Sequence, residues 1–282
     1  MLKDIRETPR EEYAEELRKR WTSLLSYRYI GRNHGSMNTG PIDNTVTLRH
    51  DMRNAAGGIL ASVLSITCPG GAGRSDLQTV PNPVIQSCQI LDDARDVKKI
   101  EVVDSILLRQ GRNMDYGRAK IVDADNHSRV IAYIEGQSAA IGDVPPGLEK
   151  MPEDKIEVVD SPDLPPLWEI FGAWKRNDGH WVLPELRIEL ASPDAALHIG
   201  PQHVTLETAA IDAASDLVGT DLLQVQTYHA MHLARGKIGP FRVDASADNA
   251  GQGRVGVQLA LVDEGNDDKL ITSAAVVFRR AD

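Results

Sequence analysis

The residues best suited to chemistry lie on one predicted helix, over residues 203–218. His203 stands in its first turn, Glu207 follows four positions later, and Asp212 stands nine positions after His203. Imidazoles and carboxylates act as general acids, general bases or nucleophiles. We therefore take Asp212 and Glu207 as candidates for a catalytic carboxylate. His203 is a candidate for direct contact with a ligand.

Asp212 also has a plainer interpretation. On a helical wheel, Leu206, Ala210 and Ala214 belong to an apolar stripe, and Asp212 lies on the opposite, polar face. A solvated face predicts an aspartate there equally well. The residue type alone does not select between the two interpretations.

A second group of residues is suited to binding a negative charge. Asn54, Gly57 and Gly58 come just before an apolar stretch at 59–66 whose spacing predicts a helix. The N–H groups and the positive dipole end at a helix start stabilise a developing oxyanion. Glycine has no Cβ and therefore lets a ligand approach closely. We expect these three residues at an oxyanion or substrate-binding turn.

Two similar hairpins organise the chain. Residues 121–131 and 261–271 share Val, Asp, Asn and Ile at matching positions, and each joins two alternating apolar runs through an Asp/Asn/Gly turn. A second echo lies upstream, where residues 108–112 parallel residues 233–237. The same segments recur in the same order, which indicates a duplicated domain.

The apolar patterns predict a strand, a helix and four strands in each half. The expected strands are 45–48, 84–90, 98–109, 114–123, 129–141, 181–190, 222–234, 238–246, 253–263 and 269–280, and the expected helices are 59–66 and 203–218. Six prolines between 144 and 166 indicate an extended linker. We therefore expect an α+β protein with a helical extension at 1–27, a first domain at 28–142, a Pro-rich linker at 143–179 and a second domain at 180–282.

This element order resembles a tandem (double) hotdog, in which each half is an antiparallel sheet wrapped around one long central helix. The turn into the second helix resembles the phenylacetate-type branch of the hotdog acyl-CoA thioesterases. That family's motif is Asn-x-x-Gly-x-x-His-Gly-Gly, with an acid nine residues after the His. Gly200, His203 and Asp212 match it, whereas Val204 and Thr205 replace the two glycines. The resemblance places Asp212 first among the two candidate carboxylates and leaves Glu207 as the substitute acid.

The first half carries the complementary part of the motif. Asn54 and Gly57 keep the Asn and Gly spacing, but Leu60 stands at the His position. The acid position falls on Pro69, or on Ser65 if Gly57-Gly58 is aligned with the family's glycine pair. The resemblance implies hydrolysis of an acyl-CoA or related acyl thioester at one composite site, with Gly57 and Gly58 from the first half and Asp212 from the second. It implies no cofactor, since CoA is part of the substrate.

Two other functions remain open. The first half lacks the acid and the second lacks the glycine pair, so the chain could be a non-catalytic acyl-thioester-binding or assembly protein. An enoyl-thioester hydratase or dehydratase of the hotdog class is less favoured, because its Asp-x-x-x-x-His pair is not found.

Basic residues recur at corresponding strand ends of the two halves. They are Arg109, Arg112 and Arg118 in the first half and Arg235, Lys237 and Arg242 in the second. Such side chains could bind the phosphates and pantetheine arm of CoA. Charged hairpin ends explain them as well.

Composition limits the partners. The net charge of −10 over 282 residues argues against nucleic acid, which needs clustered Lys and Arg. Cys68 and Cys88 lack metal spacing, and no phosphate-binding glycine loop is present. No window approaches the apolar length of a membrane span. We expect a soluble cytoplasmic protein without metal, nucleic-acid or membrane partners, and the resemblance further implies a homodimer of double-hotdog chains.

Overall fold

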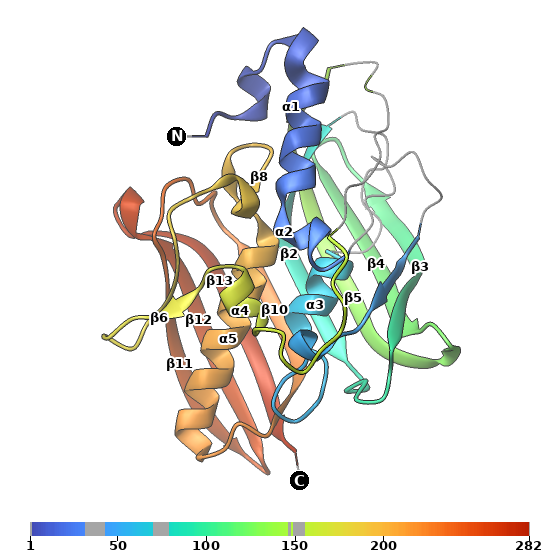
Figure 1. The fold of residues 1–282 in the computed structure, drawn as a ribbon, viewed down its shortest axis with the longest axis vertical. Coiled ribbons are helices and arrows are strands. Elements are labelled where there is room, and N and C mark those ends of the chain that lie inside the picture. The colour runs from blue at the N-terminus through green and yellow to red at the C-terminus, as the bar shows by residue number, and fades with distance from the viewer. Residues whose placement is uncertain (1, 32–42, 70–78, 146–147, 149–155, 282) are drawn as a thin grey trace.

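An antiparallel sheet of eleven strands runs through the structure, a computed structural model that describes residues 2–31, 43–69, 79–145, 148 and 156–281 (Figure 1). The strand order within these residues is β1-β3-β4-β5-β2-β10-β13-β12-β11-β7-β6. The strands of this sheet are β1 (Thr45–Thr47), β2 (Thr79–Ile90), β3 (Lys99–Gln110), β4 (Met114–Asp123), β5 (Asn126–Asp143), β6 (Trp174–Lys175), β7 (Trp181–Leu183), β10 (Leu223–His232), β11 (Phe241–Gly251), β12 (Arg254–Asp263) and β13 (Lys269–Arg280). A separate pair, β8 (Ala191–Ser192) and β9 (Ala196–Leu197), forms a small second sheet.

The two halves of the sheet meet at β2 and β10. These strands pair antiparallel from Thr227↔Gln89 to Met231↔Ile85. Outward from this junction the order is β5, β4, β3, β1 on one side and β13, β12, β11, β7 on the other. The halves therefore follow the same order, and their pairing removes one exposed edge from each.

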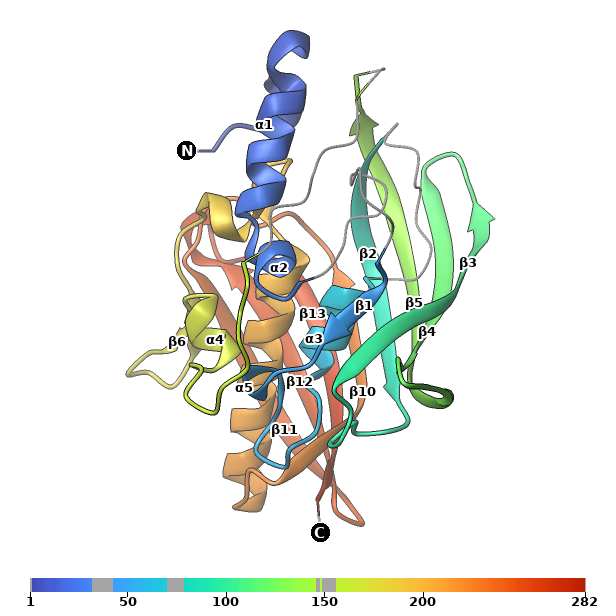
Figure 2. The ribbon, with the colours of Figure 1, turned by 45° about the vertical axis from the view of Figure 1, so that its right-hand side comes forward.

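The helices lie on one face of this sheet (Figures 1 and 2). They are α1 (Arg10–Ser23), α2 (Leu25–Arg28), α3 (Ala61–Thr67), α4 (Leu167–Ile170) and α5 (Ile199–Val218), with short 3₁₀ turns η1 (Ile5–Glu7), η2 (His50–Met52), η3 (Ile188–Leu190) and η4 (Glu264–Asn266). The long helix expected in the second half is α5. It begins four residues before the predicted start, because the His198 side chain caps it by accepting the Gly200 N–H.

The expectation of one long helix in each half is wrong for the first half. Helix α3 has only 7 residues, Ala61–Thr67. It ends before Pro69, whose ring disfavours a helical conformation at Cys68. Cys68 has a φ of −134°, outside the helical region. The core between sheet and helices is nevertheless continuous across both halves.

Two other expected segments differ. The predicted strand at 181–190 ends at Leu183, because Pro184 has no N–H to continue a ladder. The predicted extended linker at 143–179 is not wholly extended: its described part contains α4, and Leu167 and Phe171 are buried in the core. The proline-rich run ends at Pro166, and an apolar helical turn follows it. Residues 146–147 and 149–155 of this linker lie outside the described residues.

The N-terminal extension packs on the start of α5. The Ser26 hydroxyl in α2 lies 3.0 Å from Nδ1 of His198, and the Tyr27 hydroxyl lies 3.4 Å from its Nε2. A Cβ on Gly200 would clash with Oγ of Ser26 and would lie 2.8 Å from the Cβ of Ser26. Glycine is therefore required at position 200 because the extension covers it.

This contact generates a stability prediction. Gly200→Ala should lower the free energy of unfolding by about 1–3 kcal/mol, as overpacked sites do. Gly256→Ala on β12 is the matched control, because its Cβ would enter open space. Urea denaturation of both variants gives the comparison. Equal stability of the two variants would show that α2 can move away from position 200 without lowering the free energy of unfolding.

Candidate active site between the two helices

The Glu207 carboxylate connects helix α5 to the start of helix α3. Its side chain lies on α5, and the residue is 1% exposed. Its Oε1 accepts the N–H of Ala61 and its Oε2 accepts the N–H of Ser62, both at 2.7 Å. An acid from the second half thus contacts the helix start of the first half directly.

The start of α3 explains why these N–H groups need a partner. The first N–H groups of a helix have no acceptor within it. Leu60 is the N-cap residue and provides no side-chain hydrogen bond. Glu207 takes the role of a cap from another element, and its negative charge is favoured at the positive end of the helix.

Burial dominates the ionisation of Glu207. Loss of hydration raises the pKa of the carboxyl above its ordinary value, although the hydrogen bonds from Ser62 and Ala61 lower it. The site therefore holds an unusually basic carboxylate beside two polarised N–H donors. Such perturbed groups are candidates for function.

His203 lies one turn before Glu207 and is fully buried. Its Nδ1 is 2.8 Å from the Tyr228 hydroxyl, and its Nε2 is 2.8 Å from Oε1 of Gln86. Burial lowers the pKa of His203 well below its ordinary value, so the ring is neutral. His203 therefore lies within the core and not at an open helix start.

The hydrogen bonds of Gln86 determine which ring nitrogen of His203 carries the proton. Its Nε2 donates to the carbonyl oxygens of Ser65 and Cys68. Its Oε1 must then accept from Nε2–H of His203, which leaves Nδ1 to accept from the Tyr228 hydroxyl. The sequence patterns did not single out Gln86 or Tyr228. One feature of the sequence could have indicated Gln86: it is a polar residue two positions before Cys88, on the same face of the strand as that buried residue.

Asp212 occupies a different face of α5. Its Oδ2 forms an ion pair with Nζ of Lys175 at 2.7 Å and accepts a hydrogen bond from Nε1 of Trp181 at 3.2 Å. These partners belong to β6 and β7. The expected pairing of Asp212 with the first half is thus replaced by that of Glu207.

Asn54, Gly57 and Gly58 form a closed turn ahead of α3. The Gly58 N–H donates to Oδ1 of Asn54 at 3.0 Å, and the Gly57 N–H donates to the Asn54 carbonyl at 2.9 Å. Gly57 has a φ of +80°, which favours glycine. The expectation that these residues present free N–H groups is corrected: those at the helix start belong to Ala61 and Ser62.

The four basic candidates are not gathered in one place. Arg235 donates to Asp194 and to Asn82, and Nζ of Lys237 lies 3.9 Å from Oδ2 of Asp194. Both residues thus contact Asp194 within the second half, and Arg235 also links this half to Asn82 on β2 of the first half. Arg109 and Arg112 are exposed around the end of β3.

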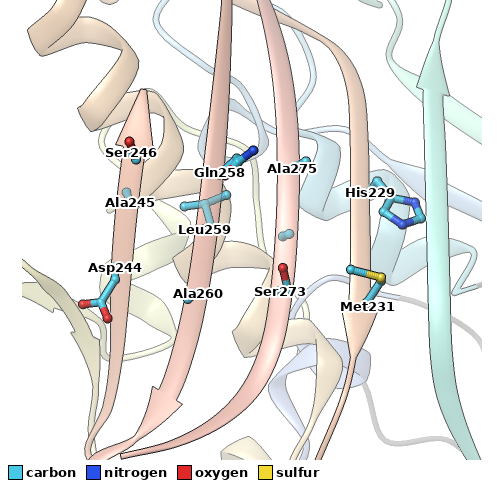
Figure 3. A pocket seen from close by; sticks show the side chains of 11 residues that line it. His229, Met231, Asp244, Ala245, Ser246, Gln258, Leu259, Ala260, Ser273 and Ala275 are labelled. Carbon is cyan, nitrogen blue, oxygen red and sulfur yellow. The ribbon is translucent and has the colours of Figure 1, made fainter. Parts of the chain in front are cut away.

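A groove of about 550 Å³ lies on the outer face of the sheet, away from the helices (Figure 3). His229, Met231, Asp244 and Gln258 are among the side chains that line it. Tyr228 precedes His229 on β10 and points the opposite way, into the core, where it is fully buried. The groove and Glu207 are therefore on opposite sides of the sheet.

Among the described residues, no three His, Cys, Asp or Glu side chains are grouped to hold a metal ion. No helix in the same part of the chain has the length and apolar character needed to cross a membrane.

No protein-family model and no curated protein sequence matches the chain.

Solved structures do match. Acyl-CoA thioesterase II TesB2 from Mycobacterium marinum aligns with a TM-score of 0.56 and 13% identity, over 88% of this chain and 98% of that chain. A 12:0-ACP thioesterase from Umbellularia californica aligns at 0.52 and 10% identity, over 84% of this chain and 93% of that one. A protein from Alicyclobacillus acidocaldarius, described as having a hot dog fold, aligns at 0.51 and 12% identity, over 88% and 98%. These likenesses, together with the large antiparallel sheet and a few helices, show that the chain has the hotdog fold.

Proposed function

We propose that the chain hydrolyses an acyl thioester at the contact between Glu207 and the start of α3. The observation that carries this proposal is the carboxylate of one half held against two backbone N–H groups of the other. Thioester hydrolysis needs a group that activates water or attacks the carbonyl, and donors that stabilise the oxyanion. Both requirements meet at this contact.

In the proposed reaction, the substrate first displaces Glu207 from its two N–H donors. The thioester carbonyl oxygen takes the place of a Glu207 oxygen on the N–H groups of Ala61 and Ser62, which polarise it. The released carboxylate then removes a proton from an attacking water or attacks the carbonyl carbon itself. In the first case the departing thiolate takes the proton that Glu207 holds, which restores the carboxylate. In the second case the thiolate leaves, and water then cleaves the anhydride between the acyl group and Glu207 to give the acid and the free carboxylate.

The likeness to solved structures adds support from fold. TesB2 is described as an acyl-CoA thioesterase, and the protein from Umbellularia californica as a 12:0-ACP thioesterase. Both CoA and a carrier protein present the acyl group as a thioester of a pantetheine arm. We infer an acyl thioester as the substrate class and acyl-CoA as the first substrate to test.

A second candidate function rests on the same contact. Both oxygens of Glu207 are engaged, so the residue also acts as a brace that holds α3 against α5. A protein that binds acyl thioesters without cleaving them, or that serves in assembly, needs only such a brace. Loss of activity without loss of stability separates catalysis from bracing.

The first test replaces the carboxylate. Glu207→Gln should reduce thioester cleavage by about 10²–10⁴-fold, the usual effect of removing an acid–base group. Release of free thiol from a panel of acyl-CoA substrates measures it. Asp212→Asn is the matched control on the same helix and should keep its activity. Inactivity of Asp212→Asn, with full activity of Glu207→Gln, would return the chemistry to Asp212.

The raised pKa of Glu207 predicts a pH dependence. Between the ordinary glutamate value of 4.5 and the raised native value, the folded state binds more protons than the unfolded state. Stability of the wild type relative to Glu207→Gln should therefore fall as pH rises through this window. The value of kcat/KM should rise over the same window, because catalysis uses the carboxylate. Denaturation curves and rates from pH 4 to 8 test both, and a flat stability difference would refute the raised pKa.

We also propose that two chains associate through the outer face of the sheet. Tyr116, Tyr133 and Met231 are 40%, 41% and 37% exposed, on strands whose opposite face packs on the core. Static light scattering should give twice the mass of one chain. Glutamate at positions 116 and 133 should return the mass to that of one chain, and a wild-type monomer at micromolar concentration would reject the proposal.

A further inference from the structure

His232 lies at the inner end of the same buried polar region. It is the last residue of β10 and is 7% exposed. Its ring centroid is 5.4 Å from that of His203. Its Nδ1 is 3.2 Å from Oγ1 of Thr272 on the neighbouring strand β13.

The neighbouring hydrogen bonds fix the protons of His232. Gln202 donates through Nε2 to the carbonyl of Leu197, so its Oε1 faces Thr272 as an acceptor. The Thr272 hydroxyl donates its single proton to that oxygen. It can then only accept from His232, whose Nδ1 must carry the ring proton. The Nε2 atom of His232 is left as a bare acceptor.

That acceptor has no partner among the described residues, although it is buried. His203 cannot supply a proton, because its two ring nitrogens already serve Tyr228 and Gln86. Burial, with a smaller effect of Arg235, lowers the pKa of His232 to about 3. The ring is therefore neutral near pH 7 and too weak a base to remove protons from water. Its suitable role is to accept a hydrogen bond.

We propose that Nε2 of His232 binds an N–H or O–H group of the acyl thioester, at a fixed distance from the reacting carbonyl. This inference rests on the proposed function. His203 and Glu207 are four residues apart, about 6 Å along α5, and the ring centroids of His203 and His232 are 5.4 Å apart. The donor thus lies roughly 5–10 Å from the carbonyl. Two chemical sources fit: an amide N–H of the pantetheine arm, or a hydroxyl along the acyl chain.

Matched pairs of substrates test this acceptor. One pair carries the same acyl group on N-acetylcysteamine, which has an amide N–H, or on propanethiol, which has none. The other pair has acyl-CoA substrates with and without a hydroxyl near the far end of the acyl chain. The wild type should prefer the donor-bearing member of one pair by about tenfold in kcat/KM, the usual scale for a polar group that lacks its partner. The pair that shows the preference identifies the source of the donor.

Substitutions at His232 should remove that preference. His232→Phe keeps the ring but lacks the acceptor, so its KM for the donor-bearing substrate should rise to that of the other member while kcat stays similar. His232→Gln restores an acceptor oxygen and should recover part of the preference. His229→Phe is the matched control, because His229 lies three positions earlier on β10 and faces the outer groove. It should leave the preference unchanged. Preference retained in His232→Phe would overturn the inference.

Calorimetry separates this inference from the proposed function. The corresponding thioethers cannot be hydrolysed, so their binding is independent of Glu207 chemistry. Tighter binding of the donor-bearing thioether by the wild type but not by His232→Phe supports the acceptor role, even if no thioester is ever cleaved. Equal binding of both members by the wild type would show that water alone satisfies Nε2, and the inference would fall.

Discussion

The arrangement of the two halves depends on the burial of one carboxylate. A buried charge is costly unless donors compensate it, and the open start of a short helix is costly unless acceptors compensate it. Glu207 and the first N–H groups of α3 meet both needs at once. Because the two partners come from different halves, the contact also fixes how α3 sits against α5. A proposed reaction centre arises where the fold already requires this contact.

The buried polar region extends from Glu207 through His203 to His232. It lies where β2 and β10 join the two halves, and Gln86 and Tyr228 enter it from those strands. Each hydrogen bond there restricts the next, because an amide or hydroxyl offers few protons. Most groups are satisfied in this way, which specifies one packing of the halves. For the same reason, the Nε2 atom of His232 is informative, because it has no partner among the described residues.

The halves share a strand order but differ at their helix starts. The start of α3 meets Glu207, whereas the start of α5 is capped by His198 and covered by the N-terminal extension. Gly200 has no room for a side chain under that cover. The two helix starts are therefore chemically different, and the start of α5 is covered by the N-terminal extension.

Much of the architecture was determined by the sequence alone. The strands β4, β5, β12 and β13 and their two hairpins follow from alternation and turn residues, which act locally and need no partner. The helix α5 was evident from its apolar stripe, and the hotdog order from the succession of elements. The first helix was expected at 59–66 and is α3, Ala61–Thr67: it begins two residues later than expected, because Leu60 is its N-cap residue, and it ends before Pro69.

The choice of carboxylate was decided only by the tertiary structure. Glu207 and Asp212 are five positions apart, which turns them about 140° from each other around the helix. Which of them reaches the first half depends on how α5 is rotated against the sheet and α3. That rotation is set by burial of the whole apolar face and by the hydrogen bonds of His203 with strands from both halves. No local pattern carries this information, because the contacts join residues more than a hundred positions apart.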